Sequence, residues 1–243
     1  MKISLVIPMY NESSIIADTA KTLSEYMSKN FDEYEILFCD DGSTDKCGEI
    51  VRDLALPCVR VTGYTQNRGK GSAVRYGVGE ADGDIIMFTD ADLAYGTDVI
   101  KRYYDFYLEN TPDLIIGSRN LDKDGYEGYT AIRRLASKLY IKVLCIVGGF
   151  RLSDSQCGCK AFGKKAAKDI FGRCEVDGFA FDFEAILWAG KLGYSISELP
   201  VKIINHRESK VNVLRDSTRM LRDLLRIKRN VRKKEKEMQR DTV

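Results

Sequence analysis

This 243-residue sequence has a single histidine, His206, and no apolar run long enough to cross a membrane. The longest apolar stretch near the middle runs from Val143 to Phe150, far short of the about 20 residues that a spanning helix needs. Cys157 and Cys159 have no second pair of ligands with which to form a structural zinc site. The sequence therefore argues against a zinc protein and against an integral membrane protein.

The rest of the composition is that of a globular domain. Hydrophobic residues make up 44% of the chain, enough to form the core of one α/β domain with a short appendage. The seven cysteines are scattered and odd in number, and the chain enters directly into the strand-like stretch Lys2 to Ile7 rather than a secretory leader. We therefore expect a protein of the reducing cytoplasm.

Positive charge is concentrated near the C-terminus. Residues 207–240 contain thirteen Lys or Arg against five Asp or Glu, although the whole chain has a net charge of only +2. Between Val211 and Arg232 apolar residues recur among these cations, as is typical of a helix lying on anionic lipid. A solvated helix packed on the domain is the alternative. We predict a globular domain over residues 1–210 and a basic amphipathic helix over residues 211–243, with a membrane surface and no nucleic acid as partner.

Short apolar, β-branched runs alternate with amphipathic stretches along the chain. Strands that alternate with helices form a parallel sheet, because each crossover returns the chain to the same edge. The pattern predicts an α/β fold with a mostly parallel central sheet flanked by helices. The expected strands are Ile3–Ile7, Glu35–Cys39, Val59–Gly63, Asp84–Phe88 and Leu114–Gly117, and the expected helices are Glu12–Ser28, Thr97–Glu109, Ala131–Val147 and Val211–Arg232.

Polar side chains gather where the predicted strands end. In a parallel sheet these carboxyl ends lie along one edge, where ligands bind. Loops from distant parts of the sequence are thus expected to line one pocket. The residues that follow the first, second and fourth strands are Pro8, Tyr10, Asn11 and Glu12, then Asp40 and Asp41, then Asp90 and Asp92.

Asp90-Ala91-Asp92 comes directly after the apolar run Ile85 to Phe88. Side chains two apart on an extended backbone point the same way, so both carboxylates would face one ion. Two hard oxygen ligands suit Mg²⁺ or Mn²⁺, which share their coordination with substrate phosphates. We predict Asp90 and Asp92 as metal ligands, with a solvated acidic turn as the alternative.

Two further segments carry candidate ligand-binding groups. Asp40-Asp41-Gly42-Ser43-Thr44-Asp45 ends a strand in a turn, where Ser43 or Thr44 can cap the next helix. The carboxylates that precede the turn can accept hydrogen bonds from a nucleobase or a ribose. Asn67-Arg68-Gly69-Lys70-Gly71 has a phosphate-binding composition but the spacing of neither a P-loop nor a dinucleotide fingerprint. Lys70 is therefore interpreted as a cation near a bound nucleotide.

Together these segments resemble family 2 glycosyltransferases of GT-A fold, and within them the dolichyl-phosphate glucosyl- and mannosyltransferases. The resemblance runs from Ile3 to about Asn212, and the motifs, each weak alone, are specific in their order and spacing. They are Val6-Ile7-Pro8-Met9-Tyr10-Asn11-Glu12, Asp40-Asp41-Gly42-Ser43-Thr44-Asp45, Asn67-Arg68-Gly69-Lys70-Gly71-Ser72-Ala73-Val74-Arg75, Asp90-Ala91-Asp92, Gly117-Ser118-Arg119 and Asp154-Ser155-Gln156-Cys157-Gly158-Cys159-Lys160.

The resemblance implies a sugar-nucleotide site beside an acceptor site. Asp90 and Asp92 would hold Mg²⁺ or Mn²⁺ on the donor diphosphate, with Lys70 nearby. The Arg-Gly-Lys-Gly and Gln-Cys-Gly-x-Lys motifs look more like those of UDP-glucose users than of GDP-mannose users. Ala94 stands where the mannosyl branch often has glutamine, so water would complete the metal shell. The nucleotide would meet Pro8, Tyr10, Glu12 and Asp41, and the acceptor phosphate would meet Arg119, Arg133, Ser137, Arg207 and Lys210.

We accordingly expect inverting transfer of a hexose from UDP-glucose to a polyprenyl phosphate, dolichyl or undecaprenyl. The acceptor phosphate has a second pKa of about 6 and is largely ionised in the cytoplasm, so no strong protein base is required. Asp182 stands among aromatic residues and is either a base for a hydroxyl acceptor or an orienting group. The enzyme is expected peripherally on the cytoplasmic face of a membrane, and a membrane protein or a second copy of the chain is a candidate partner.

Four alternatives stay open. A GDP-mannose donor, or a hydroxyl acceptor in cell-surface glycan synthesis, would keep the fold and change the substrate. A phosphatase of the haloacid dehalogenase type would use Asp90 as a nucleophile, but that motif usually continues to Thr or Val where Ala94 stands. A membrane-bound sugar-nucleotide sensor would keep the pocket without turnover, although the retained acidic pair weighs against it.

Overall fold

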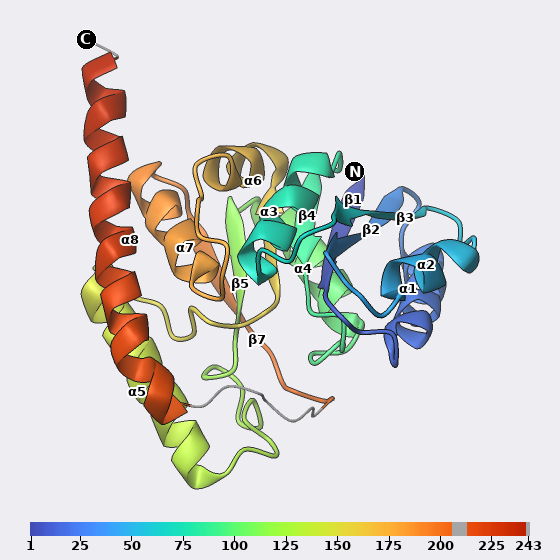
Figure 1. Cartoon of the computed structure of the whole chain (residues 1–243), viewed down its shortest axis with the longest axis horizontal. Helices are drawn as coiled ribbons and strands as arrows, with labels where there is room; N and C mark the ends of the chain where they lie inside the picture. Colours follow the sequence, from blue (N-terminus) through green and yellow to red (C-terminus); the bar gives the residue numbers. More distant parts are fainter. Residues whose placement is uncertain (206–212, 242–243) are drawn as a thin grey trace.

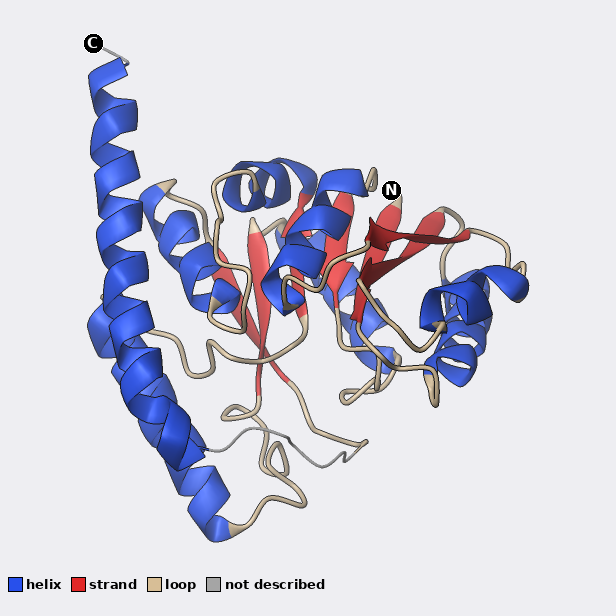
Figure 2. Ribbon diagram, in the orientation of Figure 1, coloured by secondary structure: helices blue, strands red, loops and turns tan. Residues whose placement is uncertain are grey.

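The computed structural model describes residues 1–205 and 213–241. In this part of the chain a seven-stranded sheet lies between helices on both faces (Figures 1 and 2). The strands are β1 (Ile3–Met9), β2 (Tyr34–Asp41), β3 (Val59–Tyr64), β4 (Ile85–Phe88), β5 (Leu114–Ser118), β6 (Lys160–Gly163) and β7 (Ile196–Pro200). The helices are α1 (Ile16–Asn30), α2 (Cys47–Asp53), α3 (Lys70–Glu80), α4 (Asp98–Asn110), α5 (Ala131–Gly148), α6 (Lys164–Phe171), α7 (Phe181–Lys191) and α8 (Val213–Asp241).

The sheet has the strand order β3-β2-β1-β4-β6-β5-β7 and is parallel except at β6. The five predicted strands are confirmed as β1 to β5, and so is the mostly parallel α/β architecture. The sequence did not predict β6 or β7. β6 has only four residues, and β7 is a half-buried edge strand with polar residues at its centre, so neither has a long apolar run.

The core has one part on each face of the sheet. One part packs α1, α2 and α4 against the sheet, and the other packs α3, α6 and α7 against the opposite face. β1 contributes to both parts, with Leu5 and Ile7 on one face and Val6 on the other. Burial on both faces is what a parallel sheet covered by crossover helices requires, and it explains the near-continuous apolar sequence of β1.

The last helix packs on the domain rather than standing apart. α8 contacts α7 and α5 and lies alongside them in Figure 1. Its residues Leu224, Ile227 and Val231 are buried in the same part of the core as α3, α6 and α7. Helix Val211–Arg232 was predicted, and α8 extends beyond it to Asp241. The lipid contact of this helix stays a prediction. In the described residues no helix combines the length and apolarity needed to cross a membrane.

Candidate active site

The loops after β1 and β2 are hydrogen-bonded to each other at the carboxyl edge of the sheet. Asn11, in the left-handed region with φ 53°, donates its backbone N–H to Ser43 Oγ at 3.1 Å and accepts from the Thr44 backbone at 2.8 Å through Oδ1. The expectation that Ser43 or Thr44 caps α2 is wrong, because α2 begins only at Cys47. Asp45 Oδ1 accepts from the Cys47 backbone at 3.1 Å instead.

Asp41 organises the loop that leads from β3 into α3. Its buried carboxylate accepts from the Tyr64 hydroxyl at 2.7 Å, the Asn67 side chain at 2.9 Å and the Arg68 backbone at 2.9 Å. The Gly69 backbone donates to both of its oxygens, at 3.1 and 2.8 Å. A carboxylate with this many donors fixes the loop in place. The predicted contact of Asp41 with a nucleotide stays a prediction, and the visible role is to shape the wall of the site.

Asp90 and Asp92 lie in a turn directly after β4. The argument from an extended backbone is therefore wrong: the chain turns here, with Leu93 at φ 49° and its N–H donating to the Asp90 carbonyl at 3.0 Å. Asp92 Oδ1 accepts from the Ala94 backbone at 3.1 Å. The turn, rather than strand alternation, sets the directions of the two carboxylates.

Lys70, the first residue of α3, is brought against this turn. Its ammonium lies 2.5 Å from Asp90 Oδ1. Burial opposes its positive charge, but Asp90, Asp182 and Asp92 outweigh that effect and raise the pKa of Lys70. The structure thus unites residues from three separated segments around one lysine, as the convergence of loops predicted.

Asp182, in the first turn of α7, is buried and paired with Lys160. Lys160 Nζ lies 2.6 Å from Asp182 Oδ1 and donates to the Cys157 carbonyl at 2.6 Å. It also lies 5.6 Å from the centre of the Phe88 ring. Burial raises the pKa of Asp182, while Lys160 and then Lys70 oppose that rise. This ion pair gives Asp182 an orienting partner that the sequence did not identify, although Lys160 belongs to a quoted motif.

Gly158 packs directly against Asp90. A Cβ at this position would lie 2.2 Å from Asp90 Oδ2, so any side chain would displace the carboxylate. The Gly158 backbone N–H donates to the Tyr95 hydroxyl at 3.3 Å. The segment that leads into β6 thus brings its backbone against the Asp90 carboxylate. The glycine between Cys157 and Cys159 is the sequence feature that could have predicted this contact.

The acidic pair fits a divalent ion that is shared with phosphate. Among the described residues, no cluster of three or more His, Cys, Asp or Glu side chains is arranged to hold a metal by itself. Mg²⁺ commonly binds through one or two carboxylates and takes its remaining ligands from phosphate and water. Asp90 and Asp92 supply that number of carboxylates, with Lys70 beside them as a second positive group.

Arg119 is almost fully buried at the end of β5 and is bound by Asp154. Its Nε and Nη2 donate to the two carboxylate oxygens at 2.6 and 2.9 Å. Burial opposes the charge of Arg119, yet the hydrogen bonds that it donates to Asp154 keep its pKa well above the usual value. Glu198 on β7 accepts from the Ser153 and Asp154 backbones at 2.9 and 3.1 Å. The visible role of Arg119 is to fix the 151–157 loop, and its contact with an acceptor stays a prediction.

Arg133 lies near the start of α5 and is exposed. Its guanidinium lies 4.0 Å from the centre of the Tyr129 ring, which packs edge-on against Tyr126 at 5.5 Å. Arg119 contacts the same Tyr126 ring at 5.3 Å. The two arginines are therefore connected through an aromatic pair, and half-buried Ser137 follows one turn later on α5. Arg207 and Lys210 lie outside the described residues.

The predicted nucleotide-contacting residues lie at and after the end of β1; Pro8, predicted to follow this strand, is instead within it and pairs with Cys39. Pro8 and Glu12 are half-buried, and Tyr10 is exposed. Contact of Pro8, Tyr10 and Glu12 with a nucleotide stays a prediction.

Comparison with known proteins decides the family. Residues 4–171 match the family model described as Glycosyl transferase family 2, which is more than half of the chain. The chain belongs to glycosyltransferase family 2. A dolichyl-phosphate beta-glucosyltransferase of Dictyostelium discoideum is 30% identical to this glycosyltransferase over 93% of the chain and 73% of that relative. The protein of the same name from Saccharomyces cerevisiae is also 30% identical, over 93% of the chain and 74% of the relative.

Solved structures confirm the GT-A fold of this family 2 glycosyltransferase. A Mycobacterium tuberculosis glucosyl-3-phosphoglycerate synthase, crystallised with Mn²⁺, UDP and phosphoglyceric acid, matches with a TM-score of 0.70 at 19% identity. The match covers 93% of this chain and 76% of that one. The resemblance stated from the motifs is thus confirmed at the level of family and fold.

Proposed function

We propose that this glycosyltransferase moves glucose from UDP-glucose onto the phosphate of a polyprenyl phosphate, with inversion at the anomeric carbon. The observation that carries the proposal is the similarity, over 93% of the chain, to two proteins named dolichyl-phosphate beta-glucosyltransferase. The clustering of Asp90, Lys70 and Asp182 at the carboxyl edge of the sheet supports a site for a phosphorylated donor there.

Asp90 and Asp92 would hold Mg²⁺ or Mn²⁺ at the donor diphosphate. Relatives of this fold have been crystallised with UDP and Mn²⁺ or Mg²⁺, which supports a divalent ion in this chain. When bound, the ion would offset negative charge on the departing nucleotide. Lys70 lies beside Asp90 and would add a second positive charge to the same group.

The acceptor phosphate would attack without a protein base. Its second pKa of about 6 leaves the attacking oxygen largely ionised near neutral pH. Asp182 pairs with Lys160 at 2.6 Å, which favours a positioning role over general-base catalysis. Exposed Arg133 would contact the acceptor phosphate. Arg119 would position the 151–157 loop beside it through its hydrogen bonds to Asp154. Ser137, one turn later on α5, would contact the same phosphate, and Arg207 and Lys210 would complete the proposed acceptor set.

The proposal includes a peripheral location on the cytoplasmic face of a membrane. A polyprenyl acceptor is confined to a bilayer, and the odd number of scattered cysteines favours a reducing compartment. A membrane protein or a second copy of the chain is a further candidate partner.

The test is a reconstituted transfer reaction. Purified protein is incubated with Mg²⁺ or Mn²⁺, a polyprenyl phosphate and separate samples of UDP-glucose and GDP-mannose, and the lipid product is identified by mass. We expect a hexosyl-phosphoryl lipid from UDP-glucose. Product from GDP-mannose alone, or transfer only to hydroxyl acceptors, would contradict the proposal, and nucleotide binding with no product would indicate a sensor.

The role of Asp182 is tested with Asp182→Asn and the same lipid acceptor. Asparagine keeps the size of the side chain and one acceptor oxygen for Lys160, so a positioning role predicts loss of less than about tenfold in kcat. Complete loss of turnover in a folded variant would indicate a base and contradict the base-free scheme.

A further inference from the structure

The outward face of α5 carries an apolar stripe. Ile132, Leu135, Leu139 and Ile146 are 62 to 83% exposed, although they are large aliphatic side chains. Each residue of an α-helix advances by about 100°, so these four positions fall within about 60° of arc. Ile141 and Leu144 on the opposite side are buried. α5 therefore has two apolar faces, and the core covers one of them.

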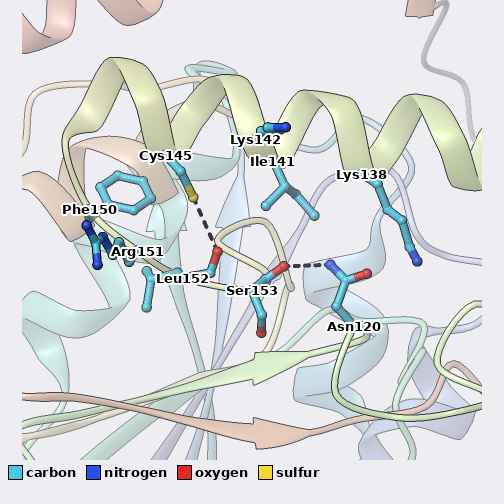
Figure 3. A pocket seen from close by; sticks show the side chains of 9 residues that line it. All are labelled: Asn120, Lys138, Ile141, Lys142, Cys145, Phe150, Arg151, Leu152 and Ser153. Atoms are coloured by element: carbon cyan, nitrogen blue, oxygen red, sulfur yellow. Dashed lines mark hydrogen bonds between the residues drawn. The ribbon is translucent and has the colours of Figure 1, made fainter.

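Positive charge flanks the stripe with no acidic residue on the helix. α5 contains Arg133, Arg134, Lys138 and Lys142 and no Asp or Glu. Lys138 and Lys142 lie along one edge of the stripe and line a groove of about 520 Å³ between α5 and the segment that follows it (Figure 3). Arg151 lines the same groove. Within the described residues, none of these cations has a carboxylate at ion-pair distance.

The groove is apolar at its base and positive at its rim. Phe150 and Leu152 line it together with Ile141, and the Leu152 carbonyl accepts from the Cys145 thiol at 3.2 Å. Asn120 donates to the Ser153 carbonyl at 2.5 Å on the far wall (Figure 3). These hydrogen bonds fix the walls of the groove. Lys138 points along the groove toward Asn120, with its ammonium 6.0 Å from the centre of the Tyr126 ring (Figure 3).

α5 is capped at both ends and packed against other helices on its inner side. Thr130 caps its first turn by accepting from the Arg133 backbone at 3.3 Å, and Gly149 ends it in the left-handed region at φ 78°. α7 and α8 pack against its inner side. The buried side chains of α8, by contrast, are its apolar ones, so α8 turns that face inward in its described part. Single exposed apolar side chains occur on other described helices, such as Leu108 on α4 and Leu225 on α8, but α5 gathers four of them on one face.

We propose that the outward face of α5 docks on the surface of an anionic lipid bilayer. Ile132, Leu135, Leu139 and Ile146 enter the boundary between headgroups and acyl chains, while Lys138 and Lys142 contact lipid phosphates. An apolar stripe edged by cations, without acidic residues, is the composition that suits such an interface. The inference rests on the proposed function. Arg133, proposed to contact the phosphate of the lipid-linked acceptor, lies on α5, so docking of α5 on the bilayer would bring the acceptor to it.

The first experiment measures partitioning of the full-length protein onto vesicles by sedimentation. Vesicles of phosphatidylglycerol and phosphatidylcholine are compared with vesicles of phosphatidylcholine alone. We expect the variant Leu135→Gln/Leu139→Gln to lower the partition coefficient at least about tenfold, because two aliphatic side chains lose burial. Leu108→Gln, which changes an exposed leucine on α4, is the matched control and should partition like the wild type.

The charge contribution is tested separately. Lys138→Gln/Lys142→Gln should lower partitioning onto the anionic vesicles by on the order of 20-fold and leave the weak binding to neutral vesicles unchanged. Lys21→Gln/Arg52→Gln removes two exposed cations elsewhere and serves as control. Unchanged partitioning of either α5 variant, or an equal loss in its control, overturns the proposal.

Two further readouts separate the explanations. Sedimentation velocity measures whether the protein is a dimer. If Leu135→Gln/Leu139→Gln makes a dimer dissociate but leaves vesicle binding unchanged, the stripe contacts a second copy of the chain and the proposal is overturned. Turnover of a water-soluble, short-chain polyprenyl phosphate should be normal in this variant, because neither leucine is among the residues proposed to contact donor or acceptor. Wild-type protein that binds vesicles but never forms the lipid product would refute the proposed function and leave the docking surface standing.

Discussion

At the scale of single residues, the site depends on how tightly Asp90 is surrounded. Lys70 contacts one of its oxygens, and Gly158 leaves room for the other. Asp92 follows on the same turn. Charge and close packing therefore act on one carboxylate, and the two effects can be tested with different substitutions.

Substitution of the acidic pair removes charge with little change in volume. We expect Asp90→Asn or Asp92→Asn to lower kcat/KM by on the order of 10²- to 10³-fold, since charge stabilisation of the leaving group is lost. Lipid product formation and the Mn²⁺ dependence of UDP binding, followed by calorimetry, are the measurements. Asp53→Asn, at an exposed site on α2, is the control. Unimpaired transfer by Asp90→Asn/Asp92→Asn would refute the proposed site.

Gly158→Ala tests the packing against Asp90. The added methyl group would lie 2.2 Å from Asp90 Oδ2, so the carboxylate must move. We expect at least about tenfold lower kcat/KM, because small displacements of catalytic groups are costly. Gly79→Ala, in α3 with open space around it, should keep full activity and a slightly higher melting temperature. Equal activity of the two variants would show that Asp90 tolerates displacement.

At the scale of elements, Glu35 joins β2 to its neighbours. It accepts from Ser4 Oγ at 2.5 Å and from the Asp82 backbone at 2.8 Å, and it lies 3.4 Å from both Lys2 and Arg60. Burial acts to raise the pKa of Glu35, but these partners together lower it below the usual value. The carboxylate thereby ties together β1, β2, β3 and the turn before β4.

This network makes stability depend on pH in a defined direction. Because the folded state lowers the pKa of Glu35, its contribution is present above the unfolded pKa of about 4.3 and is lost as the pH falls further. We expect Glu35→Gln to lower the free energy of unfolding by about 1 to 3 kcal/mol at pH 7. Urea titrations at pH 7 and below pH 4 should show this difference shrink at acidic pH. A difference independent of pH would rule out the ionised carboxylate as its source.

Elements also show where sequence reasoning succeeds and fails. β1 to β5 were predicted from their short apolar, β-branched runs, and helices α1, α4, α5 and α8 from the helical spacing of their apolar residues. β6 was not predicted because, unlike the all-apolar four-residue β4, it begins with a lysine and ends with a glycine. The turn at Asp90 was not predicted because the residue with positive φ is Leu93, at 49°, rather than a glycine. Asp90 and Asp92 were predicted as metal ligands from their position after a strand, and that role stays a prediction. Lys160 and Gly158 were not assigned, since their roles depend on contacts with residues far away in sequence.

At the scale of the whole molecule, α8 contributes to the core although it begins after all the strands. Ile227 is 3% exposed, whereas Leu225 two residues earlier is 55% exposed. We expect Ile227→Ala to lower the free energy of unfolding by about 2 to 5 kcal/mol, because it leaves a cavity. Leu225→Ala should change it by less than about 0.5 kcal/mol. Denaturant unfolding of both variants is the measurement, and equal effects would contradict the inward orientation of α8.

The reversed strand β6 separates the molecule into parts that can diversify independently. Its first residue, Lys160, pairs with Phe88 at the last residue of β4, so the chain enters β6 from the catalytic side. The end of the stretch between α5 and β6 is constrained, because Asp154 holds Arg119 and Gly158 packs against Asp90, so insertions are expected only before Asp154. Under the proposed function, new acceptor preferences would arise by remodelling the part of that stretch before Asp154, while the parallel strands that carry the proposed donor site stay unchanged.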